Sequence, residues 1–421
     1  MNLEELALIK SRLRTVFSHG APIDTSALFA GRVEQLQDAK SAISSKGQHI
    51  VVFGERGVGK TSLARVLSKD AAHNGYKQPF SGTINCDTND DFSTLWHKIF
   101  REFHITSVDR AVGFTEKVRN EIHDLSSILT DKVSPNDVRL AFNWYNRPAI
   151  VVIDELDRVK DKESITLLAD TIKTLSDHAL EVTIILVGVA DSVDQLIAEH
   201  RSVERALVQI RMPRMSLGEL SDILTKALAQ LDMQIDTDAK RYISKLAQGL
   251  PFYVHLIGMH SVEAAIDRAR RVVRIKDVEV AIAKAVNKAQ QSIRQEYVRA
   301  TRSPQRDNLY SSVLLSCALA NTDSMGFFAP SDVREPMSRV LEKCVDIPAF
   351  ARHLNEFCEA EHGSVLERVG IARKYRYRFT NPMLQPYVIL KGIAENKLSD
   401  MRYVYEVLET RDLISQPELY I

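Results

Sequence analysis

The sequence predicts an α/β fold with a parallel sheet, followed by an all-helical segment and a small segment of helices and a hairpin. Three observations lead to this expectation. A glycine-rich turn at Gly54–Thr61 joins an apolar run to a helical pattern. Further apolar runs alternate with helical periodicity up to about residue 212, which is typical of a parallel sheet covered on both faces. Beyond that point only helical periodicity remains, until two alternating runs near the C-terminus.

Composition and charge narrow the class of protein. A chain of 421 residues can form two or three domains, and 45% hydrophobic with 26% charged residues is typical of a soluble globular protein. The formal net charge is zero, so contact with nucleic acid would need a local cationic patch. The four cysteines form no C-x-x-C pair, and no apolar run reaches about 18 residues. We therefore expect a cytoplasmic protein without a disulfide framework, a zinc site or a membrane span.

The first 212 residues divide into an arm and the sheet domain. Residues 1–28 form the N-terminal arm, with an amphipathic helix at Leu3–Val16. Residues 29–212 form the sheet domain, in which strands are expected at Ile50–Phe53, Thr83–Cys86, Ala149–Ile153 and Val182–Val189. Between His104 and Arg147 we expect helices, one of them beginning after a cap at Ser134.

The rest of the chain forms two domains and a tail. Residues 213–300 form an all-helical lid, with helices expected at Leu217–Leu231, Ala239–Gln248, Phe252–Ala269 and Lys276–Arg299. Residues 301–395 begin with a polar linker. Helices are expected there at Leu309–Ala320, Ser331–Lys343 and Ile347–Glu361, before strands at Val365–Val369 and Arg373–Phe379. This order predicts a winged-helix domain, and residues 396–421 form a helical tail.

The turn at Gly54–Thr61 reads GERGVGKT and fits the P-loop pattern G-x-x-x-x-G-K-[ST]. Its glycines let successive backbone N–H groups converge on a phosphate at a helix N-terminus. Lys60 can then reach the β- and γ-phosphates, and the Thr61 hydroxyl can bind Mg²⁺. The nucleotide-binding residues expected here are Gly54, Glu55, Arg56, Gly57, Val58, Gly59, Lys60, Thr61 and Ser62.

A second motif ends a later strand, where the apolar run Ile150–Ile153 is followed by Asp154 and Glu155. The carboxyl ends of parallel strands share one edge of the sheet, so Asp154 is expected to lie near Thr61 and to complete the Mg²⁺ site. Glu155 can polarise the attacking water as a general base. The alternative is a carboxylate pair that caps a loop or a helix. Together the two motifs predict Mg²⁺-dependent hydrolysis of a nucleoside triphosphate.

With these motifs the chain resembles the AAA+ ATPases, in the branch that includes origin-recognition proteins, transposition regulators and STAND signalling NTPases. The resemblance covers residues 22 to about 270 and implies an α/β P-loop domain with a helical lid. It also implies an adenine pocket formed ahead of the first strand. The expected counterparts are Pro22, Ile23, Phe29, Gly31 and Arg32. For Phe29, ordinary core packing is the alternative.

The resemblance implies two further catalytic elements. A polar sensor 1 residue is expected after the fourth core strand, where Asp191 and Ser192 are the candidates, although either could cap the next helix. An arginine finger is expected soon afterwards, with Arg205 as first choice and Arg201 as second. A finger from a neighbouring subunit would place a guanidinium against developing phosphate charge. The alternative is a solvated arginine or one paired within its own chain.

The lid departs from the initiator pattern at Gly249-Leu250-Pro251. This triplet resembles the STAND and transposition-regulator version of sensor 2, whereas initiators usually carry an arginine slightly further on. His255 and Arg268 are the nearby cationic candidates. Pro251 is expected to pack near the adenine, or else simply to begin a helix.

The last predicted strand alternates cations with aromatic residues. On a strand this spacing places Arg376 and Arg378 on one face. Contact with duplex DNA is one interpretation, and a solvated face backed by packed aromatic rings is the other. The candidate DNA contacts are Arg373, Lys374, Arg376 and Arg378.

We therefore expect an AAA+ switch that binds ATP and Mg²⁺, hydrolyses ATP, self-associates and acts on duplex DNA. The catalytic residues expected are Lys60, Asp154, Glu155 and Arg205. The alternative is a STAND-like signalling or defence scaffold whose winged helix contacts an unidentified protein partner.

Overall fold

The computed structural model describes residues 3–18, 20, 22–73, 80–109, 119–193, 196, 201–305, 308–323, 325–371 and 374–398. The chain forms two compact units. We call Pro22–Pro213 the sheet unit, and Met1–Ala21 together with Arg214–Ile421 the helical unit. In the described ranges no helix combines the length and the apolar character that a membrane span needs.

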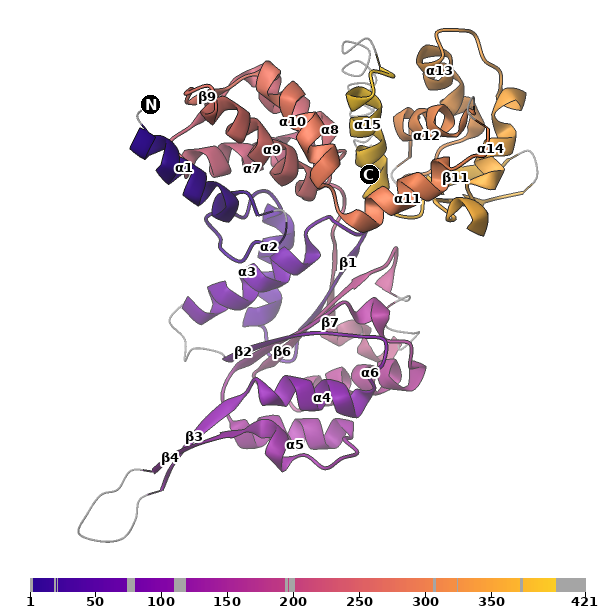
Figure 1. Cartoon of the computed structure of the whole chain (residues 1–421). Helices are drawn as coiled ribbons and strands as arrows, with labels where there is room; N and C mark the ends of the chain where they lie inside the picture. Colours follow the sequence, from indigo (N-terminus) through magenta and orange to yellow (C-terminus); the bar gives the residue numbers. More distant parts are fainter. Residues whose placement is uncertain are drawn as a thin grey trace, which may run out of the picture. The chain divides into compact units, whose positions relative to one another are not determined.

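The sheet unit is built on a parallel sheet whose described strands follow the order β2-β5-β6-β1-β7 (Figure 1). Their bounds are β1 His49–Gly54, β2 Phe80–Asn85, β5 Ala149–Asp154, β6 Val182–Val189 and β7 Leu207–Arg211. Strand β1 lies between β6 and β7 and is parallel to both. Because all five strands run in the same direction, their carboxyl ends meet at one edge, where the glycine-rich turn and Asp154 lie.

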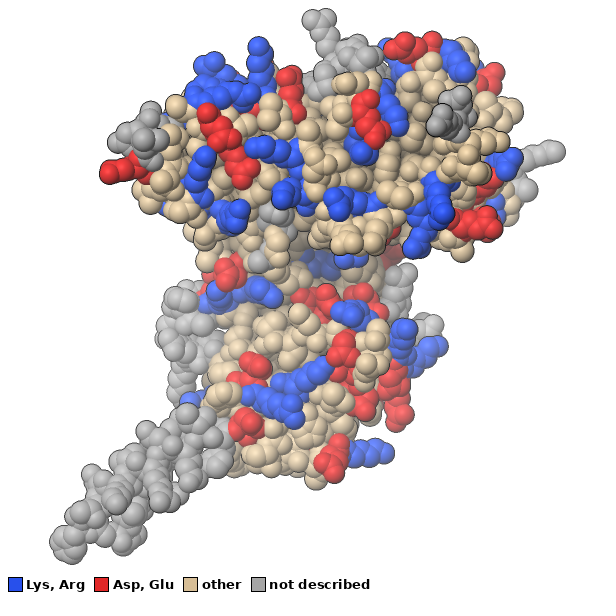
Figure 2. Space-filling model, in the orientation of Figure 1, with Lys and Arg blue, Asp and Glu red and all other residues tan. Residues whose placement is uncertain are grey.

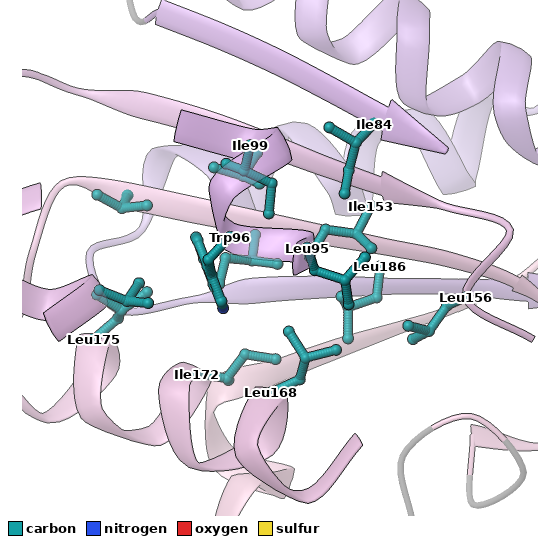
Figure 3. Packing of buried hydrophobic residues seen from close by; sticks show 14 of the residues in the cluster. Ile84, Leu95, Trp96, Ile99, Ile153, Leu156, Leu168, Ile172, Leu175 and Leu186 are labelled. Carbon is teal, nitrogen blue, oxygen red and sulfur yellow. The ribbon is translucent and has the colours of Figure 1, made fainter. Parts of the chain in front are cut away.

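Helices cover both faces of this sheet, as the apolar strands predict. Their bounds are α2 Val33–Ser44, α3 Lys60–His73, α4 Phe92–Arg101, α5 Pro135–Tyr145 and α6 Lys162–Asp177. Helices α4 and α6 enclose the apolar core shown in Figure 3, in which Trp96 and Ile172 pack with strand residues Ile153 and Leu186. Burying one such side chain contributes about 1.5–3 kcal/mol. Helix α5 begins after Ser134, whose side chain forms the expected cap with Asp137.

Two features of the sheet unit differ from the expectation. The region after His104, expected to be helical, contains an antiparallel pair, β3 His104–Asp109 and β4 Arg119–Asp124. The β-branched residues Ile105, Thr106 and Val108 favour a strand there. Strand β7 was not expected from the sequence, because it is only five residues long and just two of its residues, Leu207 and Ile210, are buried.

The helical unit begins with α1 Leu3–Val16 and continues with the lid helices. These are α7 Leu217–Ala229, α8 Thr237–Leu246, α9 Pro251–Ile266, α10 Ile275–Lys288 and α11 Gln291–Thr301. The structure differs in two details from the expected all-helical lid. A short parallel pair joins β8 Gln234–Ile235 to β9 Val272–Val273. The expected helix Lys276–Arg299 is interrupted because Ala289 and Gln290 have extended backbone.

A helix–hairpin segment, residues 310–379, follows in the same unit. It consists of α12 Tyr310–Leu319, α13 Pro330–Val340, α14 Ala351–Glu356, β10 Leu366–Val369 and β11 Arg376–Phe379. The expected helix Ile347–Glu361 is shortened to α14, with 3₁₀ turns on either side. Strands β10 and β11 are antiparallel, and Phe328 forms an isolated bridge with Tyr377. Helix α15, Leu384–Ala394, then packs on α10, α11 and α12. The expected tail from residue 396 lies almost wholly outside the described residues.

Candidate nucleotide site

The glycine-rich turn connects the end of β1 to the start of α3. Gly57 and Gly59 have φ angles of 88° and 98°, which favour glycine. Gly54 has a φ of 146°, and a Cβ atom there would overlap the carbonyl oxygen of Met212. The first turn of α3 carries no acidic residue. The turn therefore leads into a helix N-terminus that can accept an anion.

Lys60 is buried beside this turn. Its Nζ donates hydrogen bonds to the carbonyl oxygens of Gly54, at 2.9 Å, and Glu55, at 2.8 Å. Burial lowers the pKa of Lys60 to about 8, because desolvation disfavours the charged ammonium. The nearby carboxylates of Asp157 and Asp154 oppose this shift. The negative charge of a bound phosphate would stabilise the charged form of Lys60 and so raise its pKa again.

Asp154 is the last residue of β5 and is buried. Its carboxylate accepts a hydrogen bond from the backbone N–H of Glu155 at 2.8 Å, and the Thr61 hydroxyl lies near enough to favour its charged form. Burial raises the pKa of Asp154 in spite of these two contacts. The structure thus brings Thr61 and Asp154 together, as the two motifs predict.

The oxygens of Thr61 and Asp154 fit the chemistry of Mg²⁺, which takes one or two protein ligands and completes its shell with water and phosphate. In the described part of the chain, no group of three or more His, Cys, Asp and Glu residues could hold a metal ion. A site that depends on nucleotide phosphates does not require such a group. The role of both residues as metal ligands stays a prediction.

Glu155, the expected general base, directly follows the strand. Its φ of 56° is left-handed, a conformation that costs about 1–3 kcal/mol in a residue other than glycine and is common at functional sites. Its Oε2 lies 2.8 Å from Nη1 of Arg158, and both side chains are about half exposed. Such an exposed ion pair contributes about 0–1 kcal/mol, so Glu155 can exchange it for water at little cost.

The segment ahead of α2 packs against the same turn. The backbone N–H of Ile23 donates to Oγ of Ser62 at 3.1 Å. Nη2 of the buried Arg32 donates to the carbonyl oxygen of Val58 at 3.2 Å and to that of Pro213. The other residues expected at the adenine are half-buried: Pro22, Phe29 and Gly31. Two of the five thus contact the P-loop or the start of α3, and their role at the adenine stays a prediction.

The end of β6 carries the sensor 1 candidates, of which Asp191 is exposed and Ser192 half-buried. Close by lies Asp157, which the sequence analysis did not single out. Its Oδ1 accepts a hydrogen bond from the backbone N–H of Val189 at 2.7 Å, and its charge counteracts the effect of burial on the pKa of Lys60. In the sequence, Asp157 could have been recognised as a third carboxylate, three residues after Asp154.

The finger candidate Arg205 lies in a 3₁₀ turn just before β7. Its Nη2 is 2.6 Å from Oδ1 of Asp177, at the end of α6, and its side chain is 73% exposed. The alternative of an intrachain ion pair is therefore formed in this structure. The side chain of the second candidate, Arg201, lies outside the described residues.

The candidates in the lid belong to the helical unit. Pro251 is the first residue of α9 and follows Gly249, whose φ is 79°. His255 is buried and packs edge-on against Phe17, with 6.1 Å between the ring centroids. Arg268 donates to the buried carboxylate of Asp277 at 2.6 Å. Both cationic candidates for sensor 2 thus have structural contacts, and nucleotide contact by Pro251 stays a prediction.

In the β10–β11 hairpin the arginines and the aromatic residues lie on opposite faces, as the alternation predicts. Arg376 and Arg378 share the more exposed face, while the aromatic residues after them are buried. Arg376 pairs with Asp323 at 2.9 Å, and Arg378 pairs with Glu367. Both guanidinium groups also lie over the Phe327 ring, 5.9 and 4.7 Å from its centroid. These two candidates for DNA contact are therefore held by their own chain.

The other two hairpin candidates are Lys374, which is exposed, and Arg373, which lies outside the described residues. A third hairpin arginine, Arg368, donates to Oδ1 of Asn355 at 2.8 Å. Acidic and basic residues are equal in number within residues 310–379, and Figure 2 shows the two kinds side by side on this face of the molecule. The segment therefore has a formal net charge of zero.

Comparison with protein families matches residues 43–197 to the AAA domain. The matched range extends from before β1 to beyond β6, so it includes the glycine-rich turn, Asp154 and Glu155. Comparison with curated protein sequences finds no match.

Several solved structures resemble the chain at low identity. The Aeropyrum pernix ORC1 protein in complex with DNA is 15% identical over 94% of this chain and 98% of that chain, with a TM-score of 0.48. The Aeropyrum pernix ORC2 protein in ADPNP-ADP complexes is 14% identical over 92% and 99%, with a TM-score of 0.47. The Thermotoga maritima RuvB Holliday junction branch migration motor is 12% identical over 85% and 95%, with a TM-score of 0.41. Similarity at this level leaves the function open.

Proposed function

We propose that this chain, whose sheet unit has the AAA+ P-loop NTPase fold, binds ATP with Mg²⁺, hydrolyses it and works as a nucleotide-controlled switch. The observation that carries the proposal is the proximity of the Thr61 hydroxyl to the Asp154 carboxylate, beside the buried Lys60. It joins two motifs that are far apart in the sequence. The match of residues 43–197 to the AAA domain supports the same function.

In this proposal the residues of the site have distinct tasks. The N–H groups at the start of α3 bind phosphate oxygens, and the Lys60 ammonium neutralises charge on the β- and γ-phosphates. Thr61 and Asp154 would hold Mg²⁺, which supplies electrostatic stabilisation of the transferring phosphoryl group. Glu155 orients the attacking water and accepts its proton.

Replacing the base tests the proposal directly. We predict that Glu155→Gln lowers the rate of ATP hydrolysis about 10²–10⁴-fold, the range typical of a lost general base, while ATP still binds. Steady-state phosphate release and equilibrium binding of a fluorescent ATP analogue measure the two quantities separately. Chelation of Mg²⁺ should stop hydrolysis by the wild type.

The matched control is Arg158→Gln, which removes the ion-pair partner of Glu155 but leaves the carboxylate. Because that pair is exposed, the control should hydrolyse ATP within a few-fold of the wild-type rate. Hydrolysis by Glu155→Gln at the wild-type rate would show that another group activates the water.

We further propose that the active form contains several copies of the chain, with Arg205 offered to the nucleotide of a neighbour. Two observations support Arg205: it is 73% exposed, and its partner among the described residues is Asp177, in an ion pair at the surface. Breaking such a pair costs about 0–1 kcal/mol. The guanidinium can therefore leave Asp177 for a phosphate without much loss.

The structure favours a protein over duplex DNA as the partner of the helix–hairpin segment. Sequence-independent DNA binding requires uncompensated cations, whereas Arg376 and Arg378 are bound to carboxylates and the segment has no net charge. This property suits the STAND-like alternative, in which a winged helix contacts protein. Duplex DNA as a partner is tested by the hairpin substitutions discussed below.

A further inference from the structure

Helix α5 exposes one face with an unusual composition. Trp144 is 60% exposed, and Leu140, one turn before it, is 46% exposed. Residues three and four apart lie together on a helix, so neighbouring polar residues share this face. We use the name α5 patch for Asn136, Arg139, Leu140, Asn143, Trp144 and Arg147, the last of which follows the end of the helix.

The α5 patch is a rigid surface because the opposite face of the helix is firmly packed. Phe142 lies 5.0 Å from the ring of Phe100 and 5.9 Å from that of Trp96, measured between centroids. At the start of the helix, Ser134 and Asp137 form a reciprocal capping box. The helix that carries Trp144 is therefore fixed before a ligand arrives, so little backbone entropy would be lost on binding.

Among the residues that the structure describes, no carboxylate pairs with the arginines of the α5 patch. Nε and Nη2 of Arg139 donate to the neutral amide oxygen of Asn136, at 3.2 and 2.9 Å. In the described ranges neither Arg139 nor Arg147 forms an ion pair with a carboxylate. The acidic residue of the helix, Asp137, accepts from the backbone N–H of Ser134 at 2.9 Å. The patch thus differs from the hairpin, where Asp323 and Glu367 neutralise the arginines.

We propose that the α5 patch binds single-stranded nucleic acid, with a base stacked on Trp144 and phosphates at Arg139 and Arg147. An exposed aromatic face accepts any unpaired base, and guanidinium groups suit phosphate geometry. The amides of Asn136 and Asn143 can bond to base edges. A protein helix would need a wider apolar stripe, but here Leu140 is the one aliphatic member. This inference does not depend on ATP hydrolysis.

The tryptophans of the chain make the test specific. There are two of them, and Trp96 is fully buried, so quenching by a stacking ligand reports on Trp144. We expect a twelve-residue oligothymidylate to quench the fluorescence of the full chain at low salt. The affinity should fall with salt with a logarithmic slope of about −1.4, because each of two phosphate contacts contributes about −0.7 on a single strand.

Variants locate the site by anisotropy of a labelled oligothymidylate. Trp144→Ala should weaken binding at least about fivefold, the lower end of the loss for one stacked base, while Trp144→Phe should retain part of the affinity. Arg139→Gln and Arg147→Gln should each reduce the salt slope by about half. Val298→Ala removes another exposed apolar side chain, on α11, and should leave binding unchanged. Circular dichroism checks that each variant is folded.

Three results would overturn the proposal. The first is unchanged oligothymidylate affinity in folded Trp144→Ala. The second is equal quenching by a duplex of the same length, in which the base faces are hidden. The third is a blue shift of emission that grows with protein concentration and excludes the oligonucleotide, because a second copy of the chain would then cover the patch.

Discussion

At the scale of single residues, His49 shows how burial couples stability to pH. It is the first residue of β1 and is fully buried. Its Nδ1 accepts a hydrogen bond from the backbone N–H of Ile184 at 3.0 Å, which requires a neutral ring with the proton on Nε2. Burial lowers the pKa of His49 to about 4, whereas the ordinary value is about 6.5.

We predict that the free energy of unfolding falls as the pH is lowered from about 6.5 to about 4. In this window the unfolded chain binds a proton at His49 that the folded chain excludes, so acid favours unfolding. The contribution of His49 is at most about 3 kcal/mol. Urea unfolding at a series of pH values measures it.

His49→Gln is the control for this prediction. Glutamine can accept the same hydrogen bond from Ile184 but does not titrate, so the variant should lose less stability on acidification than the wild type. The carboxylates titrate alike in both proteins, so their contributions cancel when the unfolding free energies of the two proteins are subtracted at each pH. Parallel pH profiles for the two proteins would contradict the role assigned to His49.

The sequence could predict the proximity of Thr61 and Asp154, because Asp154 ends one strand and the short turn after another leads to Thr61. Parallel strands bring such ends to one edge, whatever the intervening residues do. The pairing of Arg205 with Asp177 and of Arg376 with Asp323 could not be predicted in this way. Those contacts depend on how separate helices and loops pack, which no local pattern specifies.

At the scale of elements, continuous apolar strands were the most predictable. The expected runs at Ile50–Phe53, Ala149–Ile153 and Val182–Val189 correspond to β1, β5 and β6, which are buried along nearly their whole length. Strand β7 was missed because an edge strand needs only one apolar face. The break between α10 and α11 carries no glycine or proline, so the sequence shows no signal for it.

The hairpin formed by β10 and β11 yields a prediction at this scale. If Arg376 and Arg378 stabilise the hairpin, replacing both by glutamine should lower the melting temperature by a few degrees and change duplex DNA affinity less than twofold. Each exposed ion pair contributes about 0.2–1 kcal/mol, and each stacked guanidinium about 0.5–1 kcal/mol. Thermal unfolding and anisotropy of a labelled duplex at 50–150 mM salt, roughly the range where phosphate contacts matter, measure the two effects.

Lys374→Gln serves as the comparison, since this exposed lysine lies next to the hairpin. It should change neither the melting temperature nor the duplex affinity. If the double variant instead loses most of a salt-dependent affinity for duplex DNA while remaining folded, the hairpin binds DNA and a protein partner for the segment is wrong.

At the scale of the whole molecule, the chain passes between its two units at residues 21–22 and 213–214. Each side of the second junction is anchored within its own unit. Arg32 bonds the carbonyl oxygens of Val58 and Pro213 in the sheet unit. Arg214 bonds the carbonyl oxygen of Gln248 at 3.3 Å and Oε1 of Gln385 at 2.9 Å in the helical unit. A shift of the P-loop on nucleotide binding would therefore act through Arg32 on the residue that precedes the junction.

The last prediction concerns assembly and combines two inactive variants. Arg205→Ala retains an intact nucleotide site but lacks the proposed finger, while Glu155→Gln retains the finger but lacks the proposed base. Each should hydrolyse ATP slowly, and mixing them should restore part of the activity, because Arg205 of one copy can serve the intact site of the other. Phosphate release across a series of mixing ratios, with sizing in a slowly hydrolysed ATP analogue, measures recovery and assembly together.

Asp177→Asn is the control, because it releases Arg205 without removing it and should leave hydrolysis at the wild-type rate or slightly above. Full activity of Arg205→Ala alone would exclude a finger at this position. A mixture that assembles but recovers nothing would equally exclude it, because the guanidinium would then be present at the intact sites without effect. Recovery without assembly is physically inconsistent with a residue supplied in trans, so the sizing measurement decides whether the restored activity has the proposed cause.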